Sequence, residues 1–415
     1  MTGHPIVVVG GGLAGLTAAA TAARAGATVT MLEARGRPGG RARSERRASG
    51  GVFNEGPHAL YAGLAGWREL SALGIGPRGQ RPSPHAWGRW QGRIDRLPGT
   101  NLDAIRTRLI GLRAKAELGR LLASPRRALR GDLSGSLADW IDRVARDPGA
   151  RALLSMVGRT GTYSPDPATI AASAAVPQII GAITDGVRYL DGGWQQLIDS
   201  LRSVAVAAGT VVETDAKAEA ITRSGTRWIV HTTDREVVGD AVIIAAGGPA
   251  HAARLLADHS ASLATHADSA EPALMASLDL HLAQLPISQR RACFALDAPL
   301  YFSAHTPTAN LATHGEVVHV SWYGTADDTT ESTLEDYCDE VQPGWREQVI
   351  DRRFGRHLVV AYDVPRAPDG LRGRFGPRVD DCPGVFVAGD WVGANGLLGD
   401  AAIASGAEAA RLACR

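Results

Sequence analysis

The chain has 415 residues, of which 45% are hydrophobic and 21% are charged, and its formal net charge is +1. This length is too great for one simple core and predicts two domains, while the balanced charge gives no electrostatic reason to expect a nucleic-acid partner. The cysteines lack metal-binding or redox spacing and are read as reduced thiols. A core strand is expected within six residues of the start, and no apolar run reaches membrane-spanning length, so the sequence predicts a cytoplasmic protein.

The first motif joins a strand to a helix through closely spaced glycines. The apolar run Ile6–Val9 predicts a strand buried on both faces, and the helix formers Leu16–Arg24 follow it. Between them, Gly10 allows a tight turn, Gly12 lets a pyrophosphate approach the backbone, and Gly15 lets helix and strand pack closely. The helix N-terminus would direct its free N–H groups at the phosphates.

An acidic residue completes this motif. A second strand is expected over Thr28–Leu32, and Glu33 ends it, 18 residues after Gly15, where a carboxylate can bind the two hydroxyls of an adenosine ribose. A glycine-rich turn without a ligand is the alternative reading. The strand, glycines, helix, second strand and acid stand in the right order and spacing, so the sequence predicts a dinucleotide site.

The stretch after Glu33 contains a second glycine turn, Gly39-Gly40-Arg41. Two bare backbone amides and a forked cation suit a pyrophosphate. Here the sequence resembles the flavin-containing amine oxidoreductase superfamily, which includes phytoene desaturase-like and protoporphyrinogen oxidase-like enzymes, and in which a Gly-Gly-Arg turn contacts FAD. The resemblance implies an α/β fold: an FAD-binding Rossmann-like domain of the glutathione reductase type, interleaved with an α+β substrate domain. The predicted FAD domain comprises residues 1–63, 186–268 and 371–415, and the substrate domain residues 64–185 and 269–370.

A short strand at Val52-Phe53 is expected to end at Gly56-Pro57. In the resembled family this segment passes beside the flavin ring. His58 is therefore a candidate proton acceptor or donor to the flavin, and the alternative is a histidine that only bonds to the backbone.

Residues 64 to about 185 are expected to form a helical insertion over a substrate cavity. A helical pattern places Ile105, Leu109, Leu112 and Ala116 on one face. The segment Arg106–Arg130 carries eight basic residues and one acid, Glu117. Such a helix could rest on a membrane surface, or it could be a solvated face in an arginine-rich protein, and we favour the solvated face.

Strands and helices of both predicted domains follow. Gly247-Gly248-Pro249 is not a second dinucleotide motif, because a third glycine and a ribose acid are missing, so NADPH is not expected as the reductant. The expected helices cover Leu197–Ala208, Pro249–Leu256 and Leu334–Val341. The expected strands cover Thr210–Glu213, Ala216–Ile221, Trp228–Thr232, Glu236–Val238, Asp240–Gly248 (ending in its glycines), Met275–Leu282, Val317–Tyr323 and Leu358–Ala361. Candidate cavity walls are Phe294, Tyr301, Phe302, Trp322 and Tyr323.

The C-terminal stretch contains a buried strand that ends at Gly389-Asp390 and a small-residue helix that begins near Asp400. The resemblance implies that Asp390 binds the ribityl or pyrophosphate part of FAD and that the helix N-terminus faces the flavin N1–C2=O edge. No cysteine lies in Leu397–Ala402, so the FAD is expected to be noncovalent. In full, the implied FAD contacts are Gly10, Gly12, Leu13, Ala14, Gly15, Glu33, Ala34, Arg35, Gly39, Gly40, Arg41, Gly56, Pro57, His58, Ala218, Ala246, Gly247, Gly389, Asp390, Asp400, Ala401 and Ala402.

The resemblance implies a hydride transfer from substrate to flavin, followed by reoxidation by oxygen or another acceptor. The amine oxidases of the superfamily keep a lysine near the flavin N5, whereas this chain has only Lys115 and Lys217, in other regions. Gly393–Leu398 also lacks a tyrosine for an amine cage, although Trp391 is near; it and His58 are the candidate catalytic residues. We therefore expect a desaturase or dehydrogenase acting on C–C or C–N bonds of a small apolar metabolite. The alternatives are an amine or amino-acid oxidase with an atypical site and a non-catalytic prenyl-binding relative.

Overall fold

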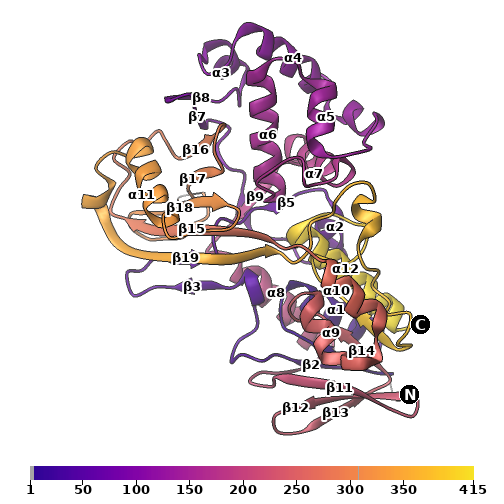
Figure 1. Ribbon diagram of the computed structural model, residues 1–415. Helices are drawn as coiled ribbons and strands as arrows, with labels where there is room; N and C mark the ends of the chain where they lie inside the picture. The colour runs from indigo at the N-terminus through magenta and orange to yellow at the C-terminus, as the bar shows by residue number, and fades with distance from the viewer. Residues whose placement is uncertain (1–3, 307) are drawn as a thin grey trace.

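A five-stranded parallel sheet forms the lower part of the molecule in the computed structural model, which describes residues 4–306 and 308–415 (Figure 1). Its strand order is β10-β2-β1-β14-β20, and every neighbouring pair is parallel. The strands therefore come from three separate parts of the chain, as the sequence predicted for a nucleotide domain. They are β1 (Pro5–Val9), β2 (Thr28–Leu32), β10 (Val211–Glu213), β14 (Ala241–Ile244) and β20 (Val385–Val387).

Both faces of this sheet are covered, which explains the unbroken apolar run of β1. Ile6 and Val8 pack into one hydrophobic cluster with α1 (Leu13–Arg24), α8 (Gln195–Ala207) and α12 (Leu398–Ala413). Val7 and Val9 face the other way, into a cluster with α9 and the small antiparallel sheet β11-β12-β13. The bounds on this second side are β11 (Ala218–Ser224), β12 (Arg227–Thr232), β13 (Glu236–Gly239), α9 (Pro249–Leu256) and α10 (Ala261–Ser269).

The segment after residue 63 begins with α2 (Ala65–Ala72), which packs against the nucleotide-domain core through Leu70 and Leu73. This core thus extends past residue 63, where the sequence placed the end of the first piece. The short strands around it are β3 (Ser44–Arg46), β4 (Val52–Asn54), β5 (Leu60–Tyr61), β6 (Gly79–Gln80) and β9 (Val187–Leu190).

A seven-stranded mixed sheet forms the second layer, with the order β19-β15-β18-β17-β16-β7-β8. Its last two strands come from residues that the sequence assigned to a helical insertion, so that expectation was incomplete. A Cβ at Gly88 in β7 would lie 2.5 Å from a Leu109 methyl group, so glycine lets that side chain pack against this strand. The strands are β7 (Trp87–Trp90), β8 (Arg93–Arg96), β15 (Ala273–Leu282), β16 (Ala292–Ala295), β17 (Leu300–Ala304), β18 (Glu316–Tyr323) and β19 (Val349–Ala361), and α11 (Thr330–Val341) lies beside them.

Five helices form a cap at the top of Figure 1: α3 (Asn101–Arg106), α4 (Leu112–Leu122), α5 (Leu137–Val144), α6 (Pro148–Thr162) and α7 (Ala172–Thr184). The predicted helical face through Ile105, Leu109 and Leu112 is wrong. The backbone becomes extended at Thr107, which ends α3, and α4 begins only after Gly111. Ile105 and Leu112 are 76% and 83% exposed as a result. Among the described residues, no helix is both long and apolar enough to cross a membrane.

Candidate functional site

The first glycine turn has the geometry that its spacing predicted. Gly10 has a φ of 106°, in the left-handed region that favours glycine. A Cβ at Gly15 would lie 1.9 Å from the Gly10 carbonyl oxygen, so only glycine lets α1 start this close to β1. Ala246, which follows β14, packs against Gly10 from the neighbouring strand.

The second glycine turn meets the first. The Gly39 N–H donates to the Gly11 carbonyl oxygen at 2.9 Å, and a Cβ at Gly40 would lie 3.3 Å from Gly12 Cα. A Cβ at Gly12 would have no neighbour closer than Gly40 Cα, at 4.0 Å. The backbone of Gly12 is thus open on the side where a ligand with a pyrophosphate would approach, as an FAD cradle requires.

Glu33 ends β2 beside these turns and is 9% exposed. Its carboxylate accepts hydrogen bonds from the Gly11 N–H at 2.8 Å and the Arg35 N–H at 2.9 Å. Burial raises the pKa of Glu33, against the opposing effect of its backbone hydrogen bonds. The carboxylate is therefore fixed at the edge of the glycine turns, where the sequence expected a ribose acceptor, and Ala34 and Arg35 continue the chain away from it.

Arg41 and Asp390 come together from opposite ends of the chain. Arg41 Nη2 lies 2.6 Å from Asp390 Oδ1, and its guanidinium stacks over the Tyr362 ring at 4.4 Å. The Asp390 carboxylate also accepts from the Tyr362 N–H at 2.9 Å. The two predicted FAD residues therefore form one charged pair that joins the second glycine turn to the end of β20, with Gly389 just before it.

The structure gives Asp400 a role that the sequence did not suggest. Its Oδ1 accepts from the Gly66 N–H at 2.6 Å, so the carboxylate caps the N-terminus of α2. Burial raises the pKa of Asp400 to about 6. The side chain thus points to α2, while contact of the backbone at Asp400, Ala401 and Ala402 with a flavin stays a prediction.

Trp391 lies in the hydrophobic cluster on the β11 side of the sheet, 1% exposed. It stacks on His266 at 5.8 Å between ring centroids. Trp391 is not among the residues that line the large cavity, and its position is one of core packing. A catalytic role for Trp391 therefore stays a prediction, which this position does not support. Ala218, at the start of β11, is also buried in this cluster.

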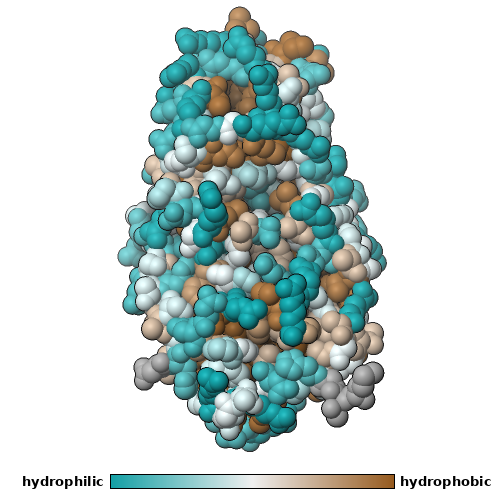
Figure 2. Space-filling model, turned by 90° about the vertical axis from the view of Figure 1, so that its right-hand side faces the viewer, coloured by the Kyte–Doolittle hydropathy of each residue, from teal (hydrophilic) through white to brown (hydrophobic). Residues whose placement is uncertain are grey.

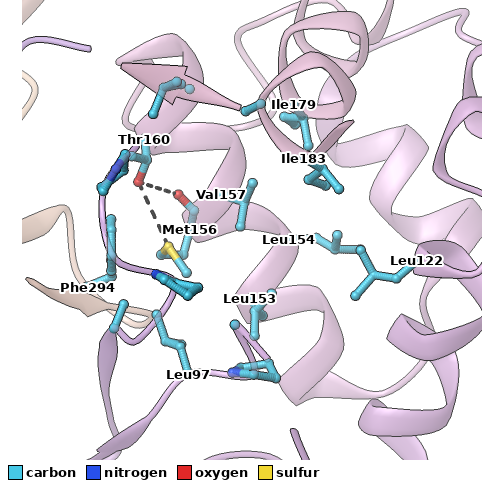
Figure 3. A pocket seen from close by; sticks show the side chains of 18 of the residues that line it. Leu97, Leu122, Leu153, Leu154, Met156, Val157, Thr160, Ile179, Ile183 and Phe294 are labelled. Atoms are coloured by element: carbon cyan, nitrogen blue, oxygen red, sulfur yellow. Dashed lines mark hydrogen bonds between the residues drawn. The ribbon is translucent and has the colours of Figure 1, made fainter. Parts of the chain in front are cut away.

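A cavity of about 900 Å³ lies between the helical cap and the seven-stranded sheet, beside the short strands β5 and β9. Figure 3 shows its apolar wall, with side chains from α4, α6 and α7 and from β16 turned toward one space. Of the predicted aromatic walls, Phe294, Tyr301 and Tyr323 line it, whereas Phe302 and Trp322 pack in the core of the seven-stranded sheet. Its inner end is more polar and is lined by Pro57, His58, Tyr61, Tyr163, Tyr189, Tyr301, His305, Tyr323 and Leu398.

His58 lies at this inner end, next to the nucleotide domain. Its Nδ1 is 2.9 Å from the Gly56 carbonyl oxygen, and its ring packs against Trp194 at 5.0 Å. Burial lowers the pKa of His58, which favours the neutral ring. The ring thus bonds to the backbone and also lines the cavity, and a proton-transfer role toward a flavin stays a prediction.

A second group of polar residues, which was not predicted from the sequence, lies beside the cavity. His305 lines the cavity and stacks on Tyr189 at 4.1 Å, and its other face meets the His319 ring at 4.8 Å. His319 Nδ1 lies 2.6 Å from Asp279 Oδ1. The Nε2 atoms of both histidines are buried without a hydrogen-bond partner in the part of the chain that the structure describes.

Asp279 is held on several sides. Ser277 Oγ donates to it at 2.7 Å, and Arg353 Nε donates at 3.1 Å. The charges of His319 and Arg353 outweigh burial, which acts in the opposite direction, and lower the pKa of Asp279. Burial, with His319 and His58 nearby, lowers the pKa of His305 well below its usual value. One signal was present in the sequence, because Ser277 and Asp279 alternate with leucines in β15, which is buried on both faces.

The fold and the glycine turns together define a dinucleotide-binding domain joined to a substrate domain with a large apolar cavity. Comparison with known proteins identifies the family. The family model described as "Flavin containing amine oxidoreductase" matches residues 13–277, and the chain belongs to this family. The predicted fold class and the predicted family are thereby confirmed, and the family description supports a flavin as the cofactor.

Individual relatives are more distant. A carotenoid 3,4-desaturase of Haloarcula japonica is 27% identical over 292 residues, which cover 62% of this chain and 59% of that protein. The solved structure of an oxidoreductase from Methanosarcina mazei superposes with a TM-score of 0.80 at 17% identity, covering 98% of this chain and 100% of that one. A putative protoporphyrinogen oxidase from Exiguobacterium gives a TM-score of 0.71 at 19% identity, with 99% of both chains covered. These structural similarities concern the fold.

Proposed function

We propose that the protein is an FAD-dependent oxidoreductase that oxidises a C–C or C–N bond of a small apolar metabolite. The observation that carries this proposal is the position of His58. It follows Gly56-Pro57 beside the nucleotide domain and lines the inner end of the apolar cavity. When bound, FAD supplies the hydride acceptor and passes the electrons on to oxygen or another acceptor.

The residues present fit FAD. The open backbone of Gly12 and Gly40 would hold the pyrophosphate, Glu33 would bind the ribose hydroxyls, and Arg41 with Asp390 would border the phosphates. Trp194 Nε1 is buried without a partner within the described residues, and the benzo edge of the same ring lies against Gly399. A polar ligand atom that reached Nε1 would satisfy it. We propose that FAD is bound noncovalently, because none of the cysteines lies in Leu397–Ala402. They are Cys293, Cys338, Cys382 and Cys414.

The cavity lining favours an uncharged substrate. Within the described residues, no Asp, Glu or Arg side chain lines the cavity. Lys115, near the outer end, is the one lysine among the lining residues. An amine cation would meet no carboxylate there, and an amino-acid carboxylate would meet no guanidinium at the inner end. This observation supports a desaturase or dehydrogenase over an amine or amino-acid oxidase. A non-catalytic prenyl carrier is disfavoured by the intact glycine turns and Glu33.

Oxidation of a CH–CH bond removes a hydride and a proton, and the proton needs an acceptor. His58 and His305 both line the inner end, and burial keeps both rings neutral and able to accept one. We assign this role to His305, because the His319 ring, paired with the Asp279 carboxylate at 2.6 Å, packs against it at 4.8 Å between ring centroids. His319 is a positioning residue in this account.

An anaerobic substrate screen tests the proposed function. The FAD-loaded protein is mixed with polyenes, other apolar alkenes and alkanes, amines and amino acids, and bleaching of the flavin absorbance is followed. We expect bleaching by an apolar compound and none by amines or amino acids. Reduction by amines alone would favour the oxidase alternative. A folded protein that takes up no FAD before the screen would favour the carrier.

The four cysteines are free in the structure, which supports a reducing compartment such as the cytoplasm as the protein's site of action.

A further inference from the structure

The proposed proton acceptor limits which C–H bond the site can break. Burial lowers the pKa of His305 well below its usual value, so its neutral ring is a weak base. A C–H group of a plain hydrocarbon is too weak an acid to pass its proton to such a ring. If the hydride left first, a carbocation would remain, and within the described residues no Asp or Glu lines the cavity to stabilise it. The reacting bond therefore needs an activating group on the substrate itself.

Two tyrosines at the inner end of the cavity offer a hydrogen bond to such a group. The hydroxyl oxygens of Tyr189 and Tyr301 lie 3.2 Å apart, and both residues line the cavity. Burial raises the pKa of Tyr301 well above its usual value, the nearby Tyr189 adds to the rise, and a hydrogen bond with Ser303 opposes it. These directions fit a chain in which Ser303 donates to Tyr301 and Tyr301 donates to Tyr189. The Tyr189 hydroxyl proton then has no acceptor within the described residues.

This donor lies beside the proposed proton acceptor. The Tyr189 ring stacks on the His305 ring at 4.1 Å between centroids, with 14° between the two planes. An oxygen of the substrate could therefore bind the Tyr189 hydroxyl while a neighbouring carbon faces His305. A hydrogen-bond donor for an oxygen on which negative charge grows, placed next to a base, is the arrangement that forms an enolate from a carbonyl compound. A carbonyl group is thus the activating group that the site suits.

The rest of the cavity is large and apolar. Its lining residues Leu122 and Ile183 are 47% and 42% exposed and mark its outer end. Figure 2 shows hydrophobic groups among hydrophilic ones at the top of the molecule, where Figure 1 draws α4. In Figure 3, Leu122 and Ile183 lie on the side away from Phe294, whose ring stacks on Tyr301 at 4.5 Å. A ligand would thus bind its polar group at one end of the cavity and its apolar part at the other.

We propose that the substrate is an uncharged apolar ketone and that the protein forms a double bond next to its carbonyl group. This proposal rests on the proposed function and names its substrate class. The ketone oxygen accepts a hydrogen bond from the Tyr189–Tyr301 pair, the carbon beside the carbonyl gives its proton to His305, and the next carbon gives a hydride to FAD, the oxidant. Two C–H bonds break and one C=C bond forms, so the ketone loses two electrons and becomes an α,β-unsaturated ketone, and FAD gains the same two electrons.

Single-turnover reduction of the FAD-loaded protein tests the proposal with ligands of one carbon skeleton. The probes are heptylcyclohexanone, heptylcyclohexane and heptylcyclohexylamine, each mixed anaerobically with the protein in a stopped-flow instrument. The early shift of the flavin absorbance gives the Kd, and the later bleaching gives the rate of flavin reduction. We expect bleaching by the ketone, with heptylcyclohexenone as the product, and none by the hydrocarbon or the amine.

Loss of both hydroxyl groups separates hydrogen bonding from packing, since either hydroxyl could donate alone. Tyr189→Phe/Tyr301→Phe keeps both rings. We expect it to weaken ketone binding by about tenfold, to leave hydrocarbon binding unchanged, and to slow flavin reduction by the ketone by about a hundredfold. Tyr337→Phe is the control, because Tyr337 is a buried tyrosine of α11 outside the cavity lining, and it should change none of these values. Flavin content and thermal unfolding establish that each variant is folded.

Absence of bleaching by the ketone in the unaltered protein would overturn the proposal, even if the double variant does not fold. Bleaching by the hydrocarbon instead would leave the proposed function standing with another substrate class, whereas bleaching by the amine alone would end both. If no probe reacts, the ketone proposal falls and the wider anaerobic screen decides the proposed function. The proposal also falls if the ketone reduces Tyr189→Phe/Tyr301→Phe as fast as Tyr337→Phe, because the tyrosine pair then does not bind its oxygen.

Discussion

Arg41 and Asp390 are separated by 349 positions in the chain, yet their side chains form an ion pair at 2.6 Å. The pair joins the second glycine turn to the carboxyl end of β20 through the backbone of β19 and Tyr362, since Arg41 Nη1 also donates to the Val360 carbonyl oxygen at 2.8 Å. The candidate FAD site is therefore held in shape from both ends of the chain by contacts within the protein itself.

The variant Asp390→Asn should loosen this site. It leaves the Arg41 guanidinium beside a neutral amide, and we expect FAD affinity to fall on the order of tenfold, together with a lower Tm. Flavin fluorescence titration and thermal unfolding measure the two effects. Asp328→Asn is the control, because Asp328 pairs with Arg356 at the surface, with a side chain that is 95% exposed. Equal effects of the two variants would contradict the structural role of Asp390.

Glu33→Ala should weaken FAD binding by about ten- to a hundredfold, because charge-assisted hydrogen bonds to the ribose are worth about 1.5–3 kcal/mol. The Kd for FAD, measured by titration of flavin-free protein, checks this. Glu219→Ala, at an exposed position of β11, serves as the comparison and should leave the Kd unchanged. A Glu33→Ala protein that retains FAD through dialysis as the unaltered protein does would refute the assignment.

His305→Gln should slow anaerobic flavin reduction by about a hundredfold with FAD still bound, as expected for loss of a general base. The rate is measured by stopped flow with the substrate that the screen identifies. His281→Gln is the matched control, because His281 lies on β15 two residues from Asp279 and its Nε2 is bonded to the His314 carbonyl oxygen, outside the cavity lining.

His319→Gln distinguishes positioning from packing. We expect a smaller loss of rate than in His305→Gln and a displaced acidic limb of the pH–rate profile, since the ring behind His305 is replaced. If His305→Gln reduces flavin at a near-normal rate while His58→Ala does not, the proton acceptor is His58 and its assignment to His305 is wrong.

Asp400 provides a pH-dependent test of the packing between α2 and α12. Its pKa in the folded protein is about 6, above the ordinary value of 3.8, so the ionised carboxyl opposes folding above pH 6. This penalty disappears as the pH falls from about 6 to about 4, because the folded state then binds the extra proton. Asp400→Asn should therefore be more stable than the unaltered protein near pH 8, by on the order of 1–3 kcal/mol, and equally stable near pH 4. Chemical denaturation at both pH values measures this difference, and a variant less stable at pH 8 would contradict it.

The sequence predicted the local parts of the site well. The turns at Gly10 and Gly39 are local patterns, and the strand before each helix of the nucleotide domain is an unbroken apolar run whose burial needs no long-range information. Glu33 could be placed beside the first glycine turn because its distance from Gly15 is set by one helix and one strand.

The remaining features depend on contacts between distant segments. Asp279 and His319 meet only because β15 and β18 pair in a register that sets them opposite each other. Asp400 caps a helix 334 positions away, which its own helical neighbours do not reveal. Trp391 adjoins a cofactor motif in sequence but turns to the opposite face of the sheet, into the core. The apolar spacing of Ile105 and Leu112 is that of a single helix, but the extended backbone at Thr107 ends α3 between them.

Titration of flavin-free protein with FAD tests the central claim most directly. The account predicts saturable binding of one FAD per chain, with all of the yellow colour in the supernatant after acid precipitation, because FAD would be held by the two glycine turns, Glu33 and the Arg41–Asp390 pair without a covalent bond. Failure of the folded protein to bind FAD would contradict the account, and yellow colour retained in the acid precipitate would contradict its noncovalent part.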